Sequence, residues 1–325
     1  MAVMSRRRSI LLAAVVALLA VAVFVVWRYD LLSSWAEEPA PRIAPEPPPL
    51  AEGQIDIRVM SFNILDATKR LRITRWDQRK ALAVEVINAF HPDLLGTQEA
   101  QPFQAAYLDQ HLPGHQFVGV GRRDGRDEGQ FVAIFFKRDR FEKLAEGHFW
   151  LSETPDVPGS KDWLSPVPRV VSWLKLRSRS QPAPAFFYFN THVDPVSVWA
   201  RNESAVLLRK RVATIAGGAP VIVTGDFNSN EGTKCYRLML DDSDGLGLGL
   251  IDSYRRVHPA EQGNEGTWHG PGGIRPDRRI DWILHTPHFT PIATAIDRTK
   301  KDGQYPSDHF PVTAVLRLSA SLGGR

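Results

Sequence analysis

The chain has 325 residues, of which 43% are hydrophobic and 23% charged, a globular composition that excludes a disordered or fibrous chain. Its formal net charge of +4 is too small a bias to identify a nucleic-acid-binding protein. The single cysteine, Cys235, excludes an internal disulfide framework and cysteine zinc clusters, so any catalysis must use carboxylates, histidines and amides.

The N-terminus has the pattern of a membrane segment. Residues 1–9 are basic, and 18 uninterrupted apolar residues follow from Ile10 to Trp27. A helix over residues 10–27 would be about 27 Å long, close to the roughly 30 Å hydrocarbon core of a bilayer. The pattern predicts a single-pass helix in the inner (cytoplasmic) membrane, with the rest of the chain outside the cytoplasm. The alternatives are a cleaved signal peptide, which would leave a periplasmic or secreted protein, and a buried core helix.

Residues 28–52 have the composition of a linker. Six of the eleven residues from Pro39 to Pro49 are proline, which excludes a helix and favours extended polyproline II. We therefore expect a semi-rigid stalk between the membrane segment and a globular domain that covers residues 53–325.

The globular domain alternates strand and helix patterns. Helices are predicted over residues 76–90, where Leu82, Val86 and Phe90 share one face, and over residues 198–215. Short apolar runs predict strands that outnumber the helices, so sheets packed face to face with helices outside fit better than one doubly wound sheet. The predicted strands cover residues 55–64, 93–99, 130–137, 170–176, 185–192, 220–228, 279–286 and 310–318.

Polar side chains lie inside these apolar strands or directly at their ends. A core strand gains nothing from a carboxylate there unless the carboxylate is paired or bound to a cation. Because several strands end in this way, we expect their acids, amides and imidazoles to converge on one site. These residues are Asn63, Glu99, His192, Asp226, Asn228, Asp281, Asp308 and His309.

The same segments resemble the endonuclease/exonuclease/phosphatase superfamily, which has the DNase I-like fold, and within it an uncharacterised bacterial branch. The resemblance rests on six motifs in order: MSFNIL, GTQEA, FNTHVD, VTGDFNS, RRIDWIL and YPSDHFPV. It implies a four-layer α/β sandwich of two packed mixed sheets flanked by helices. It also implies divalent-metal-dependent cleavage of phosphoester bonds at the shared edge of the two sheets.

Phosphoester hydrolysis requires a positioned water and neutralised phosphoryl charge, and the residues at the strand ends offer both. Glu99, a hard oxygen ligand, would hold Mg²⁺, with Mn²⁺ as the alternative metal and Asn63 and Asp308 as further ligands. Asp226 would orient or deprotonate the attacking water, and Asn228, on the same side of an extended chain, would donate to a phosphate oxygen. The structural alternatives are a helix N-terminal acid at Glu99 and an Asx turn closing the strand at Asp226.

His192 and His309 are the expected electrophilic donors, and the family pattern implies that Asp281 pairs with His309 and keeps it protonated. Asn190 shares the face of His192 and would hold its ring, and Arg201 matches a basic position of this branch. Many relatives carry a glutamate where this chain has Gln130, which cannot stabilise charge on His192. Asn190, Arg201 and Gln130 are therefore the weaker candidates for substrate contact.

The substrate class stays open at this level. Residues 69–80 are rich in Lys and Arg around Trp76 and would suit a nucleic-acid backbone, although a solvated helix start is the favoured explanation. We expect a phosphodiester, as in a nuclease or a phospholipase or sphingomyelinase, in preference to a monoester. No protein partner is predicted. A non-catalytic module that binds phosphorylated ligands on the same fold is the alternative function.

Overall fold

The computed structural model describes residues 49–69, 75–270 and 278–319, which lie within one compact unit, Pro47–Arg325. No helix among these residues is long and apolar enough to span a bilayer. The predicted membrane segment at residues 10–27 and most of the predicted linker lie outside the described residues, as do residues 70–74 of the basic segment.

The first sheet has six strands in the order β11-β12-β1-β2-β4-β3. Strand β1 (Ile55–Asn63) pairs in parallel with β2 (Leu94–Ala100) and antiparallel with β12 (Val312–Leu318). Next to β2 lies β4 (Phe131–Lys137), and the two edges are β3 (His115–Val118) and β11 (Phe289–Ile296).

The second sheet also has six strands, in the order β5-β6-β7-β8-β10-β9. Strand β7 (Phe186–His192) pairs in parallel with β8 (Val221–Asp226), and β8 pairs antiparallel with β10 (Asp281–His285). The other members are β6 (Val170–Ser178) and the two edges, β5 (Phe141–Trp150) and β9 (Ile251–Asp252). Both sheets are therefore mixed, as the resemblance implied.

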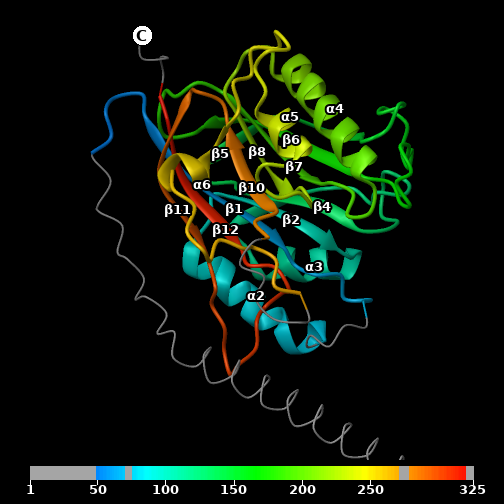
Figure 1. Cartoon of the computed structure of the whole chain (residues 1–325). Coiled ribbons are helices and arrows are strands. Elements are labelled where there is room, and N and C mark those ends of the chain that lie inside the picture. Colours follow the sequence, from blue (N-terminus) through cyan, green and yellow to red (C-terminus); the bar gives the residue numbers. More distant parts are fainter. Residues whose placement is uncertain (1–48, 70–74, 271–277, 320–325) are drawn as a thin grey trace, which may run out of the picture. The chain divides into compact units, whose positions relative to one another are not determined.

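Helices cover the outer faces of both sheets (Figure 1). Helices α2 (Trp76–Phe90) and α3 (Pro102–His111) pack with β1, β2 and β4, and α4 (Val198–Ala216) and α5 (Lys234–Leu240) pack with β7, β8 and β10. A further apolar core lies between the two sheets, in addition to the cores between each sheet and its helices. The short helix α6 (Ser253–Val257) contacts β10 and β11. The four-layer α/β sandwich predicted from the sequence is thus confirmed.

A buried polar seam joins the two sheets. The Asn190 side chain on β7 donates from Nδ2 to the carbonyls of Thr97 and Ala133 in the first sheet, both at 2.9 Å. Its Oδ1 accepts from Gln98 Nε2 at 2.8 Å. Asn190 is fully buried, so it holds the sheets together and neither contacts the His192 ring nor reaches a substrate.

We predict that Gly96→Ala destabilises the protein, because an added Cβ on Gly96 would lie 2.6 Å from Asn190 Oδ1. Overpacking of this kind costs about 1–3 kcal/mol. The measurement is the free energy of urea unfolding. Gly114→Ala is the matched control, because no atom lies within 4 Å of its added Cβ. Equal stabilities for the two variants would show that the side chains around Gly96 can shift to accommodate the added Cβ.

Candidate active site

The polar strand ends meet at one end of the sandwich. In the second sheet, the paired registers place His192, Asp226 and Asp281 in one row across β7, β8 and β10. Asn63 at the end of β1 donates from Nδ2 to Asp226 Oδ2 at 3.0 Å and so links the first sheet to this row. A cleft of about 530 Å³ opens here. Its lining comprises Lys69, Glu99, Arg122, Gln130, Arg169, His192, Pro195, Asp226, Asn228, Trp268, Arg278, Ile280, Asp308 and His309.

Asp226 is the centre of the polar network. Besides the Asn63 donor, its Oδ2 lies 3.4 Å from His192 Nε2 and 3.8 Å from His309 Nε2. Burial and the nearby charge of Asp281 raise the pKa of Asp226 to about 7. A carboxylate with such a pKa exchanges a proton readily at neutral pH, which is the property that a general base needs.

His309 is held and charged by a carboxylate behind it. Its Nδ1 lies 2.8 Å from Asp281 Oδ2, which also accepts a 2.6 Å hydrogen bond from Thr267 Oγ1. Burial alone would lower the pKa of His309, but Asp281 and Asp226 together raise it to about 10. The imidazole is therefore protonated at neutral pH and presents Nε2 to the cleft as a cationic donor.

His192 differs from His309 in charge. It is 4% exposed, and burial together with the nearby charges of Arg169 and Arg122 holds its pKa well below the usual value. A neutral imidazole cannot stabilise phosphoryl charge as strongly as a cation. The two histidines thus differ in charge: His309 is cationic, and His192 is neutral beside Asp226.

Glu99 adopts a strained backbone at the end of β2. Its φ of 64° is left-handed, a conformation that costs a non-glycine residue about 1–3 kcal/mol and is concentrated at functional sites. Its Oε2 accepts from the Asp66 amide at 2.9 Å, and Lys69 Nζ lies 2.6 Å from both carboxylate oxygens. Burial would raise the pKa of Glu99, but Lys69 lowers it, so this buried carboxylate is ionised and holds a cation.

Two groups of residues fit a divalent cation. Asp226, Asp281 and His309 offer ligand atoms within 4.8 Å of one another and could hold a metal ion. Without a metal, Asp281 and Asp226 favour the protonated form of His309, and a metal bound at its ring nitrogen would displace that proton. Glu99 and Asp308 line the same cleft with hard carboxylate oxygens, and Glu99 already gathers the Lys69 ammonium. The pair Glu99 and Asp308 is therefore the second candidate, and it is the one that the sequence predicted.

The expected geometry of Asp226 and Asn228 needs correction. Strand β8 ends at Asp226, and Asn228 has a left-handed φ of 49°, so the two residues do not lie in one extended segment. The Asn228 amide donates to Asp226 Oδ1 at 2.9 Å, which closes an Asx turn. Asn228 still lines the cleft, and one N–H of its side chain donates to the Val193 carbonyl at 3.0 Å.

The weaker sequence candidates lie elsewhere than expected. Arg201 does not line the cleft, and its Nη1 donates to the Asp194 carbonyl at 3.1 Å. Gln130 does line the cleft, but it bridges Arg122 and Asp66 without bonding to His192. In the basic segment, Trp76 is buried and packs beside Arg79, so neither is placed to grip a nucleic-acid backbone.

Three basic residues at or near the cleft were not predicted individually: Lys69 and Arg79 belong to the basic segment at residues 69–80, and Arg169 carried no signal in the sequence. Buried Arg79 donates to the carbonyls of Leu65 and Pro306, which joins the loops after β1 and before β12. Lys69 and Arg169 reach the cleft from loops, where single basic residues are common. Only the tertiary contacts distinguish them from solvated charges.

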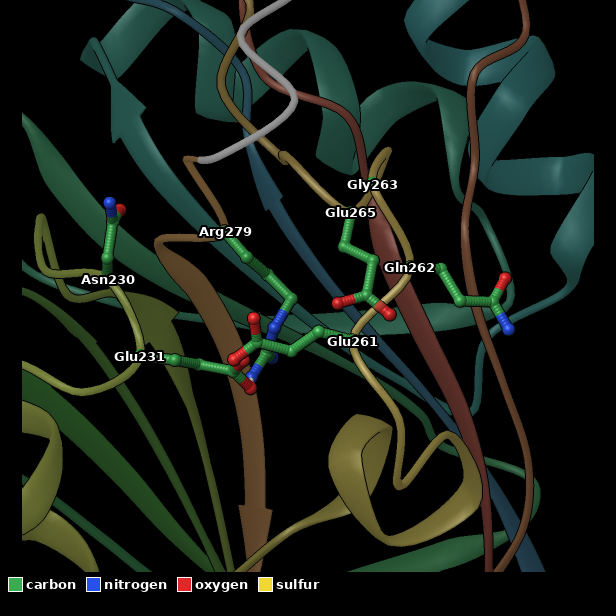
Figure 2. A pocket seen from close by; sticks show the side chains of 7 residues that line it. All are labelled: Asn230, Glu231, Glu261, Gln262, Gly263, Glu265 and Arg279. Carbon is green, nitrogen blue, oxygen red and sulfur yellow. Dashed lines mark hydrogen bonds and ion pairs between the residues drawn. The ribbon is translucent and has the colours of Figure 1, made fainter.

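A second cavity, of about 430 Å³, lies beside the start of β10 and is lined mainly by polar residues. Figure 2 shows the Arg279 side chain running toward the Glu231 carboxylate, to which it is paired. Arg279 also contacts Asp252 at 2.5 Å, and Arg255 bridges Glu231 and Glu265. These ion pairs fix the loop next to Asp281 and so support the catalytic row from behind.

Comparisons with known proteins agree with this geometry. A family model described as the Endonuclease/Exonuclease/phosphatase family matches residues 60–309. An endonuclease/exonuclease/phosphatase family protein from Bacteroides thetaiotaomicron is 32% identical, with a TM-score of 0.71, over 82% of this chain and 100% of that chain. The resemblance to bacterial members that the motifs indicated is therefore confirmed.

Two further proteins bear on the chemistry. A mannosyl-6-phosphatase from the same bacterium is 32% identical, with a TM-score of 0.69, over 80% of this chain and 99% of that chain. Mouse nocturnin is 24% identical over 78% of this chain. The match covers 63% of the length of nocturnin, so the chain corresponds to part of that protein.

Proposed function

Because the chain belongs to the endonuclease/exonuclease/phosphatase family, we propose that it is a phosphoric ester hydrolase whose reaction takes place in the cleft around Asp226. The observation that carries this proposal is the position of Asp226 Oδ2, 3.8 Å from His309 Nε2, while the Asp281 carboxylate holds the other ring nitrogen of His309 at 2.8 Å. Asp226 has a pKa raised to about 7, and His309, held by Asp281, has a pKa raised to about 10. One site thus combines a base with a cationic donor, as hydrolysis requires.

In the proposed reaction, Asp226 acts on the attacking water and His309 acts on the phosphoryl group. Asp226 orients a water and accepts its proton, while His309 Nε2 donates to a phosphoryl oxygen that gains charge in the transition state. Asn63 Nδ2 and His192 Nε2 fix the Asp226 carboxylate. The Asn228 side chain lines the cleft and has one N–H bonded to the Val193 carbonyl, and its second N–H would donate to a phosphate oxygen.

We also propose that Glu99 and Asp308, with the Asn63 side-chain oxygen, hold Mg²⁺ or Mn²⁺. A divalent cation there would neutralise phosphoryl charge next to the base. Asn63 Oδ1 accepts from the Leu65 amide at 3.0 Å, and its second lone pair remains for the metal. The Lys69 ammonium would then move from the Glu99 carboxylate, because the two cations compete for the same oxygens.

Glu99→Gln is expected to weaken Mg²⁺ binding at least roughly tenfold, because it removes a carboxylate ligand, and to abolish metal-dependent hydrolysis. The measurement is calorimetric titration of the full-length chain with Mg²⁺, alongside hydrolysis with Mg²⁺ or EDTA. Asp281→Asn is the control that separates the two candidate metal groups. Loss of Mg²⁺ binding in Asp281→Asn, with normal binding in Glu99→Gln, would move the metal to the Asp281 group.

The sequence favours a phosphodiester, as in a nuclease or a phospholipase, and bis-p-nitrophenyl phosphate, plasmid DNA and sphingomyelin test those classes. A phosphatase among the similar structures supports a monoester as the second candidate. A non-catalytic binding module is the remaining alternative. Metal binding without turnover of any ester, in a folded protein, would favour that module.

We further propose that the domain lies outside the cytoplasm, tethered by the apolar segment at residues 10–27. Support comes from the basic residues before this segment and the proline-rich stretch after it. Protease added to intact spheroplasts should then degrade the domain, and full protection would contradict the proposal.

A further inference from the structure

Two arginines line the cleft on the side of His192. Burial lowers the pKa of Arg122 to about 10, and the nearby positive charge of Arg169 adds to the effect. Arg169 is only 5% exposed. The nearby carboxylates of Asp194, Asp226 and Glu99 compensate part of the Arg169 charge, and an anion bound in the cleft would compensate more of it.

Arg169 is incompletely paired within the described residues. Its Nε and Nη1 are buried without a hydrogen bond, and the closest carboxylate oxygen, Asp194 Oδ2, lies 3.5 Å from Nε. Asp194 is already engaged by other donors, the amides of Val196 and Ser197 at Oδ1 and Ser165 Oγ at Oδ2. Arg169 lines the cleft, and two of its buried donors have no acceptor among the described residues, which an anion bound at the guanidinium would supply.

The hydrogen-bond partner of the Arg122 guanidinium is a neutral amide, so this partner does not compensate the positive charge. Arg122 Nη1 donates to Gln130 Oε1 at 2.5 Å, and Gln130 Nε2 donates in turn to Asp66 Oδ2 at 2.7 Å. The Arg122 backbone is fixed as well, since its carbonyl accepts from Trp150 Nε1 at 2.6 Å. The amide of Gln130 thus orients the Arg122 guanidinium without neutralising it.

We propose that Arg122 and Arg169 form a binding site for a terminal phosphoryl group, so that the preferred substrate is a phosphomonoester; this inference rests on the proposed function. Guanidinium forks match the planar spread of phosphoryl oxygens and bind them with charge-assisted hydrogen bonds. A monoester carries about 1.5 to 2 negative charges near neutral pH and offers three free oxygens.

A diester would suit this site less well. It carries one negative charge and only two free oxygens. One free oxygen faces His309 and the metal ligands, so the second ester group of a diester would lie toward the arginines. At least one buried guanidinium would then lose its acceptor, and such a mismatch disfavours the wrong ligand.

The test compares two esters in the full-length chain with Mg²⁺: p-nitrophenyl phosphate and bis-p-nitrophenyl phosphate. The wild-type chain should hydrolyse the monoester with the higher kcat/KM. Arg169→Gln and Arg122→Gln should each lower kcat/KM for the monoester by about 10- to 100-fold, the worth of hydrogen bonds to a charged group, and change the diester value by less than about fivefold. Arg123→Gln, an exposed arginine beside Arg122 that does not line the cleft, is the matched control and should change neither.

A binding measurement separates this inference from the proposed function. Orthophosphate at pH 8, titrated calorimetrically, should bind at least roughly tenfold more weakly to Arg169→Gln, whereas dimethyl phosphate should bind the variant and the wild type equally. Arg169→Lys, which keeps the charge and loses the fork, should bind orthophosphate with intermediate affinity. Because Asp194 retains its other donors, we expect these variants to fold.

The outcomes are distinct. Equal losses for both esters, a wild-type preference for the diester, or orthophosphate binding that does not depend on the arginines would each overturn the monoester site while leaving hydrolysis intact. Turnover of neither ester, together with arginine-dependent orthophosphate binding, would refute the proposed hydrolase and support the anion site.

Discussion

Asp226→Ala is expected to lower kcat for phosphate-ester hydrolysis by about 10²-fold or more, since a positioned general base contributes roughly 10²–10⁴-fold. The variant removes the carboxylate that Asn63 Nδ2 and His192 Nε2 hold at 3.0 and 3.4 Å. The measurement is initial-rate kinetics with saturating metal. Near-normal turnover in this variant would remove Asp226 from the role of base.

A stability measurement distinguishes loss of a catalytic group from loss of the folded structure as the cause of low activity. The pKa of Asp226 is raised in the folded state, so the fold binds a proton there more tightly than the unfolded chain does. Stability from this group is therefore present at low pH and is lost as the pH rises toward and through about 7. At pH 8 without metal, Asp226→Asn, which keeps the volume and removes the charge, should unfold at the same or a higher temperature than the wild type. Low activity with undiminished stability would identify a functional carboxylate.

The sequence predicted the interior of both sheets and missed their edges. All eight predicted strands correspond to interior strands, within about three residues at each end, whereas β3, β5, β9 and β11 are the edges that the patterns did not reveal. Interior strands are covered on both faces and form continuous apolar runs. The edges mix buried and exposed positions, and β11 contains Pro291, a residue that sheets tolerate mainly at edges.

Some residues of the site could be predicted from the sequence and others could not. Acids and imidazoles within apolar strands, such as Asp226, Asp281 and His192, could be found from the sequence because burial of such groups needs a reason. The bond between Gln130 and Arg122, and the incomplete pairing of Arg169, could not, because each depends on loops that meet only in the folded chain. The turn at Asn228 was mistaken for strand because GDFN continues an apolar run without a glycine or proline break after Asp226.

His309→Ala is likewise expected to lower kcat by about 10²-fold or more, through loss of a preorganised cationic donor. Asp281→Asn should have an effect of similar size although it leaves the ring in place. Its carboxylate, 2.8 Å from His309 Nδ1, raises the pKa of that imidazole together with Asp226, against the opposing effect of burial. Steady-state kinetics of the two single variants and the double variant test this pairing.

If Asp281 acts only through His309, the double variant should be about as slow as either single variant, because residues that act as a unit lose their contribution once. Thr267→Val is the control, since it removes the 2.6 Å hydrogen bond to Asp281 Oδ2, together with the acceptor of the Ile280 and Asp281 amides, and leaves both charges. Its loss should be well below that of Asp281→Asn. Losses that multiply in the double variant would show that Asp281 contributes independently of His309, for instance as a metal ligand, and would restore the Asp226, Asp281 and His309 group as the metal site.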